Sequence, residues 1–306
     1  MVKEDEVTGW RSMTCAELMA QALRVKLANR GRQFSLCSII NAKSGQCSED
    51  CRFCAQSAHF KTGAPVYPLL GREQVLAAAW AAKNSGAEHF SLVTSGRGLA
   101  GRDLERVAEL ISAIRREVGI AVCASLGILR AEDFLMLKEA GMSRYHHNLE
   151  TSEAFFSRIA TTHTFAERVD TILAAKAAGL EVCAGGIFGL GETEGDRIAM
   201  ALALRGLEVD SVPINLLIPL PGTPMAGTPP LSVLDTLRSI ALYRLLLPGI
   251  PIRLAAGRET ALQDFLSSAF MAGADGMMIG GYLTEKGRLP EMDLQFVQMI
   301  RELWQG

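Results

Sequence analysis

The stretch Cys47-Ser48-Glu49-Asp50-Cys51-Arg52-Phe53-Cys54 carries three cysteines at the spacing C-x3-C-x2-C. Four thiolates normally hold an iron-sulfur cube, so a tight group of three leaves one iron without a protein ligand. That open iron can bind a small molecule. The motif therefore predicts a 4Fe-4S cluster held by Cys47, Cys51 and Cys54, with one exchangeable position.

Two other kinds of metal site use the same residue types. A structural zinc site wants four Cys or His ligands, and the nearest histidine is His59, in Ala58-His59-Phe60. A four-cysteine electron-transfer cluster needs a fourth thiolate nearby, whereas the next cysteine after Cys54 is Cys123. Both alternatives stay open, and the spacing favours the cluster with the open iron.

Composition and charge narrow the classes of protein. The chain has 306 residues and no linker, which predicts one domain over residues 1–306: a helical extension (1–32), a barrel (33–285) and a C-terminal helix (286–306). The net charge of -2 with dispersed basic residues predicts no nucleic-acid partner, and no run approaches about 18 apolar residues, which predicts no membrane partner. The acidic start lacks a secretory signal, so we expect a cytoplasmic protein whose seven cysteines are metal ligands rather than disulfides.

Short apolar runs alternate with longer amphipathic stretches, after a helical lead-in at about residues 14–29. Eight strands are predicted, at residues 35–41, 88–93, 121–125, 143–149, 181–188, 211–217, 250–255 and 276–279. Helical patterns lie between them, at residues 73–85, 104–118, 131–140, 165–178 and 231–246. Eight βα units in about 250 residues are what a TIM-type (β/α)8 barrel requires. A doubly wound open sheet is the alternative, and it would disperse the cysteines along one crevice.

Three further cysteines and an arginine fall on alternate strands of this barrel. They are Cys37, Cys123, Cys183 and Arg253, on the first, third, fifth and seventh predicted strands. Interior side chains of such a barrel stack in layers drawn from alternate strands, so the four can share one layer. A single cysteine is usually a small buried hydrophobe, but a buried guanidinium needs negative partners such as thiolates or sulfide. We therefore predict an auxiliary iron-sulfur cluster deep in the barrel, with Cys15 as a structural thiol outside it.

Taken together, the motifs resemble the biotin synthase family of radical S-adenosylmethionine (AdoMet) enzymes, from about residue 33 to residue 304. The segments that carry the resemblance are CSEDCRFCAQS (47–57), YHHNLETS (145–152), CAGG (183–186), GLGET (189–193), VPIN (212–215) and RLAAGRE (253–259). In that family AdoMet binds the open iron of a 4Fe-4S cluster at the mouth of the barrel. A sulfur-donating auxiliary cluster lies below, usually 2Fe-2S with three cysteines and one arginine.

The resemblance implies sulfur insertion into dethiobiotin to make biotin. An electron given to the 4Fe-4S cluster cleaves AdoMet to methionine and a 5'-deoxyadenosyl radical, which removes a substrate hydrogen. The substrate radical then takes a sulfide from the auxiliary cluster, and a second AdoMet completes the ring. A flavodoxin- or ferredoxin-type electron donor and a homodimer are also implied.

Two rival functions share part of this pattern. Another radical AdoMet barrel, of the hydrogenase-maturation or methylornithine-forming type, would share the mouth but need not bind a ureido substrate. A non-catalytic iron-sulfur carrier would need no AdoMet-binding residues.

One position departs from the family pattern. The family places an auxiliary-cluster cysteine on the second strand, where this chain has Ser91. A serine oxygen is a harder and poorer ligand for a sulfide-rich cluster than a thiolate. The first strand instead offers Cys37, where the family pattern has no ligand. We therefore expect the ligand to have moved across the barrel, and the cluster to be 2Fe-2S or a larger sulfide-bearing cluster.

The resemblance also implies residues for AdoMet. Phe53 matches an aromatic position that packs near adenine, and Gly185, Ile187 and Gly189 lie in a G-x-I-x-G-x-x-E motif that also contacts adenine. The remaining matches are Asn148 and Glu150, placed together on the fourth predicted strand for the ribose, and Arg168 for the AdoMet carboxylate. Glu150 replaces the usual Asp. A guanidinium suits bidentate binding of a carboxylate.

The substrate is matched by two amides. Asn215 corresponds to the asparagine that binds the cyclic urea of dethiobiotin, and Asn148 also reaches the substrate. An amide both donates and accepts hydrogen bonds, as a ureido group does. His146 and His147, at the end of a strand, are interpreted as structural groups without a catalytic role.

Overall fold

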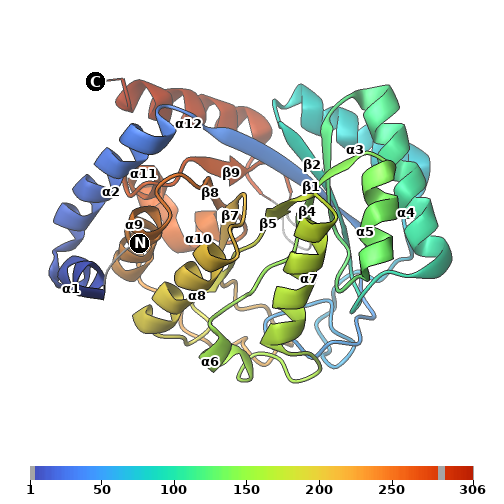
Figure 1. Ribbon diagram of the computed structural model, residues 1–306, viewed down its shortest axis with the longest axis horizontal. Coiled ribbons are helices and arrows are strands. Elements are labelled where there is room, and N and C mark those ends of the chain that lie inside the picture. Colours follow the sequence, from blue (N-terminus) through green and yellow to red (C-terminus); the bar gives the residue numbers. More distant parts are fainter. Residues whose placement is uncertain (1–3, 282–286, 306) are drawn as a thin grey trace.

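Nine short parallel strands form one sheet in the computed structural model, which describes residues 4–281 and 287–305 (Figure 1). The strands are β1 (Ser35–Lys43), β2 (His89–Thr94), β3 (Ala121–Ser125), β4 (Met142–His146), β5 (Glu181–Cys183), β6 (Gly186–Phe188), β7 (Val212–Leu216), β8 (Ile252–Leu254) and β9 (Gly276–Met278). Their order in the sheet is β5-β4-β3-β2-β1-β9-β8-β7-β6. Strands that are consecutive in the chain therefore pair, with the exception of β5 and β6, and β9 pairs with β1.

The sheet closes into a barrel because its two ends belong to one stretch of chain. β5 pairs with β4 and β6 pairs with β7, and only Ala184 and Gly185 separate β5 from β6. The Ala184 N–H donates to the Ser211 carbonyl at 3.0 Å, while the Leu149 N–H donates to the Gly185 carbonyl at 2.9 Å. The predicted fifth strand is thus the seam of the ring, in two pieces. The TIM-type barrel is confirmed.

Gly185 makes this seam possible. A Cβ atom there would lie 1.9 Å from the carbonyl oxygen of Pro213 on β7, which no side chain tolerates. The two backbones approach this closely only because glycine has no side chain. Gly185, the first glycine of the CAGG motif, therefore has a packing role in the barrel wall.

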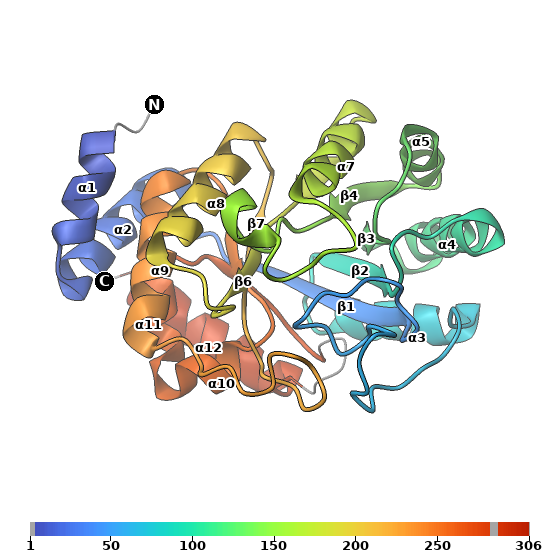
Figure 2. The same cartoon turned by 90° about the horizontal axis from the view of Figure 1, so that it is seen from below.

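Helices surround the strands on the outside (Figures 1 and 2). They are α1 (Glu4–Ser12), α2 (Cys15–Arg30), α3 (Arg72–Asn84), α4 (Gly101–Ala113), α5 (Ala131–Glu139), α6 (Glu153–Phe156), α7 (Phe165–Ala177), α8 (Glu194–Gly206), α9 (Val233–Leu246), α10 (Arg258–Leu262), α11 (Leu266–Met271) and α12 (Pro290–Leu303). α1 and α2 both lie within residues 1–32, where a helical extension was predicted, and α2, which matches the lead-in at about residues 14–29, packs on α9. The predicted boundary between residues 285 and 286 lies outside the described residues.

Side-chain caps explain where the helices near the site begin. Thr164 caps α7 by accepting from the Glu167 N–H, and the Glu167 carboxylate accepts from the Thr164 N–H in return. Thr193 and Asp196 form the same capping box at α8. Such boxes satisfy N–H groups that have no partner within the helix. They fix the start of α7, and with it the position of Arg168 in its first turn.

The apolar core lies between the strands and the surrounding helices, with residues such as Leu92, Val107 and Ile172 fully buried. The C-terminal helix α12 is joined to the barrel by a buried ion pair, in which Arg258 Nη2 lies 2.8 Å from Asp293 Oδ2. Among the residues that the structure describes, no helix is both long and apolar enough to cross a membrane.

Candidate active site

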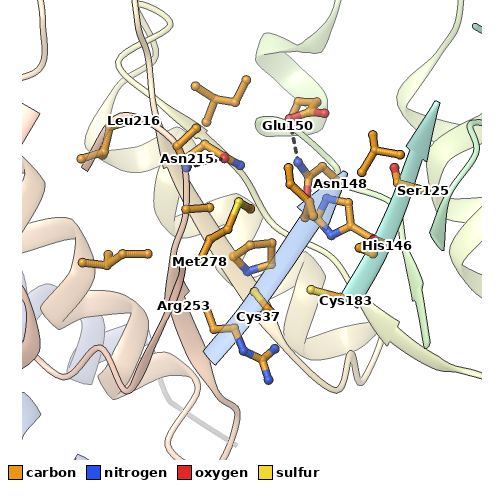
Figure 3. Close-up of a pocket in the computed structure, with 18 of the residues that line it drawn as sticks. Cys37, Ser125, His146, Asn148, Glu150, Cys183, Asn215, Leu216, Arg253 and Met278 are labelled. Atoms are coloured by element: carbon orange, nitrogen blue, oxygen red, sulfur yellow. Dashed lines mark hydrogen bonds between the residues drawn. The ribbon is translucent and has the colours of Figure 1, made fainter. Parts of the chain in front are cut away.

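A cavity of about 340 Å³ lies inside the barrel and extends to the loops that follow the carboxyl ends of β1, β4, β7 and β8. The predicted site residues that line it are Cys37, Phe53, Cys54, Ser91, Cys123, Asn148, Glu150, Cys183, Ile187, Asn215 and Arg253. Figure 3 shows Asn148, Glu150 and Asn215 at one end of the cavity and Cys37, Cys183 and Arg253 at the other. The sequence-predicted residues therefore gather at two levels of one space.

The C-x3-C-x2-C motif forms a loop that folds back over the mouth of the barrel. The Cys47 N–H donates to the Gln56 carbonyl at 3.1 Å, and the Cys54 N–H donates to the Cys51 carbonyl at 2.9 Å. Cys54 and Phe53 face the cavity, while Cys51 packs in a small apolar cluster beside it. The three motif cysteines are all unpaired thiols.

Burial keeps two of these thiols protonated when no cation is nearby. It raises the pKa of Cys51 to about 12 and that of Cys54 to about 11. A bound metal reverses this effect, because thiolates are its ligands and its charge compensates theirs. In the described part of the chain, no three His, Cys, Asp or Glu side chains gather around a single ion position. Cys54 alone of the three faces the cavity, but Cys47 lies near enough to both Cys51 and Cys54 to affect their pKa values, as neighbouring ligands of one cluster at the mouth would.

Asn148 and Glu150 lie beyond the strand on which they were predicted. β4 ends at His146, and Glu150, whose φ of 69° is left-handed, forms only an isolated bridge to Gly186. The prediction that they share a side is nevertheless right, because Asn148 Nδ2 donates to Glu150 Oε2 at 3.2 Å and both line the cavity. Asn148 Oδ1 accepts from the Gly185 N–H at 3.1 Å, which ties this segment to the seam.

Arg168 stands behind this segment rather than in the cavity wall. Its Nη1 donates to the Asn148 carbonyl at 2.9 Å and lies 3.6 Å from Glu150 Oε1. Burial raises the pKa of Glu150, and the guanidinium opposes that shift. The side chain of Arg168 is only 12% exposed. The predicted AdoMet residues Gly185 and Gly189 also lie outside the cavity lining, as do Cys47 and Cys51.

The deep end of the cavity combines thiols with cationic groups. Arg253 Nε donates to Ser35 Oγ at 2.9 Å, and its Nη1 donates to Ser211 Oγ. Burial raises the pKa of Cys123 to about 12 and also raises that of Cys37. Burial opposes ionisation of Cys183 too, but a hydrogen bond from His146 and the charge of Arg253 lower its pKa to about 6. One thiolate is therefore already favoured among the three deep thiols.

The strand register separates Ser91 from Cys37. Cys37 pairs with His89 on β2, whereas Ser91 pairs with Cys123 on β3. Ser91 pairs with Ile39 on β1, so Ser91 and Cys37 are two residues apart in the register of these neighbouring strands. A ligand at Cys37 instead of Ser91 would therefore come from the neighbouring strand, two residues nearer the amino end in register.

Asn215 has its amide oriented by two backbone groups. Its Nδ2 donates to the Gly186 carbonyl at 3.3 Å, and its Oδ1 accepts from the Ala256 N–H at 3.2 Å. An amide has two N–H groups and two lone pairs, so one of each remains for a ligand in the cavity. That pair of groups matches one edge of a ureido group.

Several residues of the site were not predicted from the sequence. Arg144 lines the cavity and pairs with Glu181 at 2.6 Å, and a charged residue two positions before His146 in a strand could have been recognised as facing inward. Glu49, inside the cysteine motif, accepts from His163 Nδ1 at 2.6 Å. No local pattern marks His163, which is 114 residues away.

Family models match most of the chain. The model of the Radical SAM superfamily matches residues 43–204, and that of the Biotin and Thiamin Synthesis associated domain matches residues 213–303. The chain is 52% identical over 285 residues to a biotin synthase from Pelotomaculum thermopropionicum, covering 93% of this chain and 89% of the relative. A biotin synthase from Thermotoga petrophila is 48% identical over 293 residues, covering 95% of this chain and 97% of the relative.

Solved structures show the same fold at low sequence identity. The crystal structure of methylornithine synthase (PylB) superposes with a TM-score of 0.85 at 20% identity, covering 98% of this chain and 93% of that chain. The hydrogenase maturase HydG from Carboxydothermus hydrogenoformans has a TM-score of 0.81 at 19% identity, covering 95% of this chain and 72% of that chain. These two structures support the barrel alone.

Proposed function

Because the chain belongs to the biotin synthase family of the radical SAM superfamily, we propose that it inserts sulfur into dethiobiotin to form biotin. The observation that carries this proposal is one cavity with Cys54 of the motif at its mouth and Cys37, Cys123 and Cys183 at its base. A substrate between the two levels would face both a radical source and a sulfur source. The rival barrels share the fold but do not require the deep thiols.

In this proposal the motif cysteines hold a 4Fe-4S cluster, and AdoMet lies between that cluster and the seam of the barrel. Phe53 and the Gly185–Gly189 segment contact adenine, Asn148 and Glu150 contact the ribose, and Arg168 binds the carboxylate. Support comes from the geometry of this segment, since the Asn148 amide is bonded to both Glu150 and the seam. These contacts would hold AdoMet in one orientation, which is the main contribution of a protein to such chemistry.

The auxiliary cluster is proposed to take Cys37, Cys123 and Cys183 as ligands, without Ser91. Arg253 completes the set, as a direct ligand or as a counter-charge, and the cluster is 2Fe-2S or a larger sulfide-bearing type. The support is that all three thiols and the buried guanidinium line the deep end of the same cavity. When bound, the clusters and AdoMet supply the radical and sulfide chemistry, while the chain orients the substrate and keeps water out.

Asn215 is proposed to bind the ureido ring of dethiobiotin, with Asn148 also in reach. The two backbone bonds to Asn215 fix its remaining N–H and lone pair toward the cavity. The family resemblance further supports a flavodoxin- or ferredoxin-type electron donor and a homodimer, both of which remain proposals.

The proposed function is tested by anaerobic reconstitution with iron and sulfide, followed by incubation with AdoMet, a reductant and dethiobiotin. We expect biotin to form, with methionine and 5'-deoxyadenosine as AdoMet products. AdoMet cleavage without any biotin, at saturating dethiobiotin, would contradict the proposal and favour a different radical AdoMet reaction.

A matched pair of variants tests the auxiliary ligands. Cys37→Ser should lose auxiliary iron and biotin formation while keeping AdoMet cleavage, because a hydroxyl replaces a thiolate at a ligand position. Ser91→Ala should keep its full iron and sulfide content. Iron and sulfide counting with Mössbauer spectroscopy measures both. Normal auxiliary iron in Cys37→Ser, or its loss in Ser91→Ala, would refute the proposed ligand set.

A further inference from the structure

A chain of hydrogen bonds joins the loop of the cysteine motif to the segment after β4, and His163 is its middle member. His163 Nδ1 lies 2.6 Å from Glu49 Oε2, and Arg168 Nε lies 3.1 Å from His163 Nε2. Arg168 Nη1 then donates to the Asn148 carbonyl at 2.9 Å. One imidazole ring thus connects a residue between two motif cysteines to the proposed AdoMet segment.

The partners of His163 determine where its proton lies. A guanidinium can only donate, so His163 Nε2 must offer its lone pair to Arg168. The ring proton therefore lies on Nδ1 and is donated to Glu49. A second proton on the ring would place two N–H groups against each other at Nε2. His163 consequently works as a neutral ring with one donor and one acceptor.

The surroundings hold the ring in this state. The His163 side chain is only 3% exposed, and the Phe156 ring packs against it at an interplanar angle of 77° with ring centroids 5.4 Å apart. Burial and the nearby charge of Arg168 lower the pKa of His163, so the ring is neutral at physiological pH. Glu49 is held in turn by Thr162 Oγ1 at 2.8 Å and by Arg97 Nη1 at 3.4 Å. Few alternative positions are open to this ring.

We propose that His163 is a positioning residue for AdoMet, which fixes the Arg168 guanidinium against the motif loop by accepting its Nε–H. Fixing Nε orients the rest of the planar guanidinium, because its donors have a rigid geometry. Arg168 would then meet the AdoMet carboxylate without first losing the freedom of a long side chain. This inference rests on the proposed function, in which Arg168 binds that carboxylate.

The test compares two ligands on the reconstituted enzyme: AdoMet and decarboxylated AdoMet. His163→Phe keeps the ring volume but removes both hydrogen bonds, and we expect it to weaken AdoMet binding by roughly tenfold or more. Its affinity for decarboxylated AdoMet should equal that of the wild-type enzyme. His163→Gln retains a donor and an acceptor and should restore most of the AdoMet affinity. Equilibrium dialysis measures binding, and the AdoMet-induced change in the EPR signal of the reduced cluster gives a second readout.

Equal losses for both ligands would show that His163 only supports the fold, and no loss for either would show that Arg168 needs no positioning. Either result overturns the inference. Arg168→Gln, measured with the same two ligands, separates a failure of the His163 inference from a failure of the proposed function. If Arg168→Gln weakens the binding of both ligands equally, the proposed role of Arg168 itself is wrong. If Arg168→Gln weakens only AdoMet binding and His163→Phe does not, only the role of His163 is wrong. If His163→Phe does not fold, His163→Leu carries the same comparison.

Discussion

Replacing Asn215 by alanine is expected to weaken dethiobiotin binding by roughly tenfold to a hundredfold. Two of the four hydrogen-bonding positions of the Asn215 amide are used by Gly186 and Ala256, so two remain for the substrate. A buried ureido group left without these partners costs about 1–3 kcal/mol. This cost covers both lost hydrogen bonds together, because water can enter a cavity of about 340 Å³ and replace part of the lost hydrogen bonding.

Isothermal titration of dethiobiotin into the anaerobic reconstituted enzyme measures this change. Asn215→Asp is the matched control, since it preserves shape and the acceptor for the Ala256 N–H but cannot donate to the ureido carbonyl. We expect its dethiobiotin affinity to fall as well, while AdoMet affinity stays unchanged in both variants. An unchanged dethiobiotin affinity in Asn215→Ala, or an equal loss of AdoMet affinity, would refute the assignment of Asn215 to the substrate.

Three further predictions concern the motif and the fold. Replacing any one motif cysteine by alanine should abolish reductive AdoMet cleavage, and substantial cleavage by all three variants would rule out the motif as the cluster site. Gly185→Ala should lower the free energy of unfolding in urea by more than about 3 kcal/mol, because its Cβ would lie 1.9 Å from the Pro213 carbonyl oxygen. In the control Gly206→Ala the new Cβ meets nothing within 4 Å, so stability should be unchanged or higher. Asp293→Ala should destabilise by about 3 kcal/mol in the same assay, because it removes a partner of the buried Arg258; a change below about 1 kcal/mol would contradict that.

The barrel could be predicted because its strands are short apolar runs at regular spacing, and all eight predicted runs lie in the wall. The split of residues 181–188 could not, because it depends on the close approach of Gly185 to Pro213, residues 28 apart in the chain. The sequence also placed Asn148 and Glu150 on a strand, since nothing in the local pattern reveals the left-handed backbone of Glu150.

The parts of the candidate site that could be predicted are those in which the spacing of residues along the chain indicates the chemistry. The motif cysteines stand together in the chain, and alternate strands placed the deep thiols in one space. The level at which each side chain enters the cavity was not predictable, because the pairing of Cys37 with His89 and of Ser91 with Cys123 depends on the stagger of the barrel. The contact of Glu49 with His163 was not predictable for a similar reason, because it depends on how the folded barrel brings together two segments that are 114 residues apart.

The seam of the barrel, residues 181–188, also fixes a distance along the cavity. Cys183 and Ile187 lie on the same stretch, one at the deep end of the cavity and one toward its mouth. Four residues of extended chain span at most about 13 Å, so the number of residues from β5 to β6 limits the separation between the proposed sulfur end and the proposed AdoMet end. An insertion of one residue there would lengthen the gap and turn the following side chains to the other face of the wall. The distance between these two ends is therefore set by the backbone of the wall, whereas the lining side chains set the shape of the space between them.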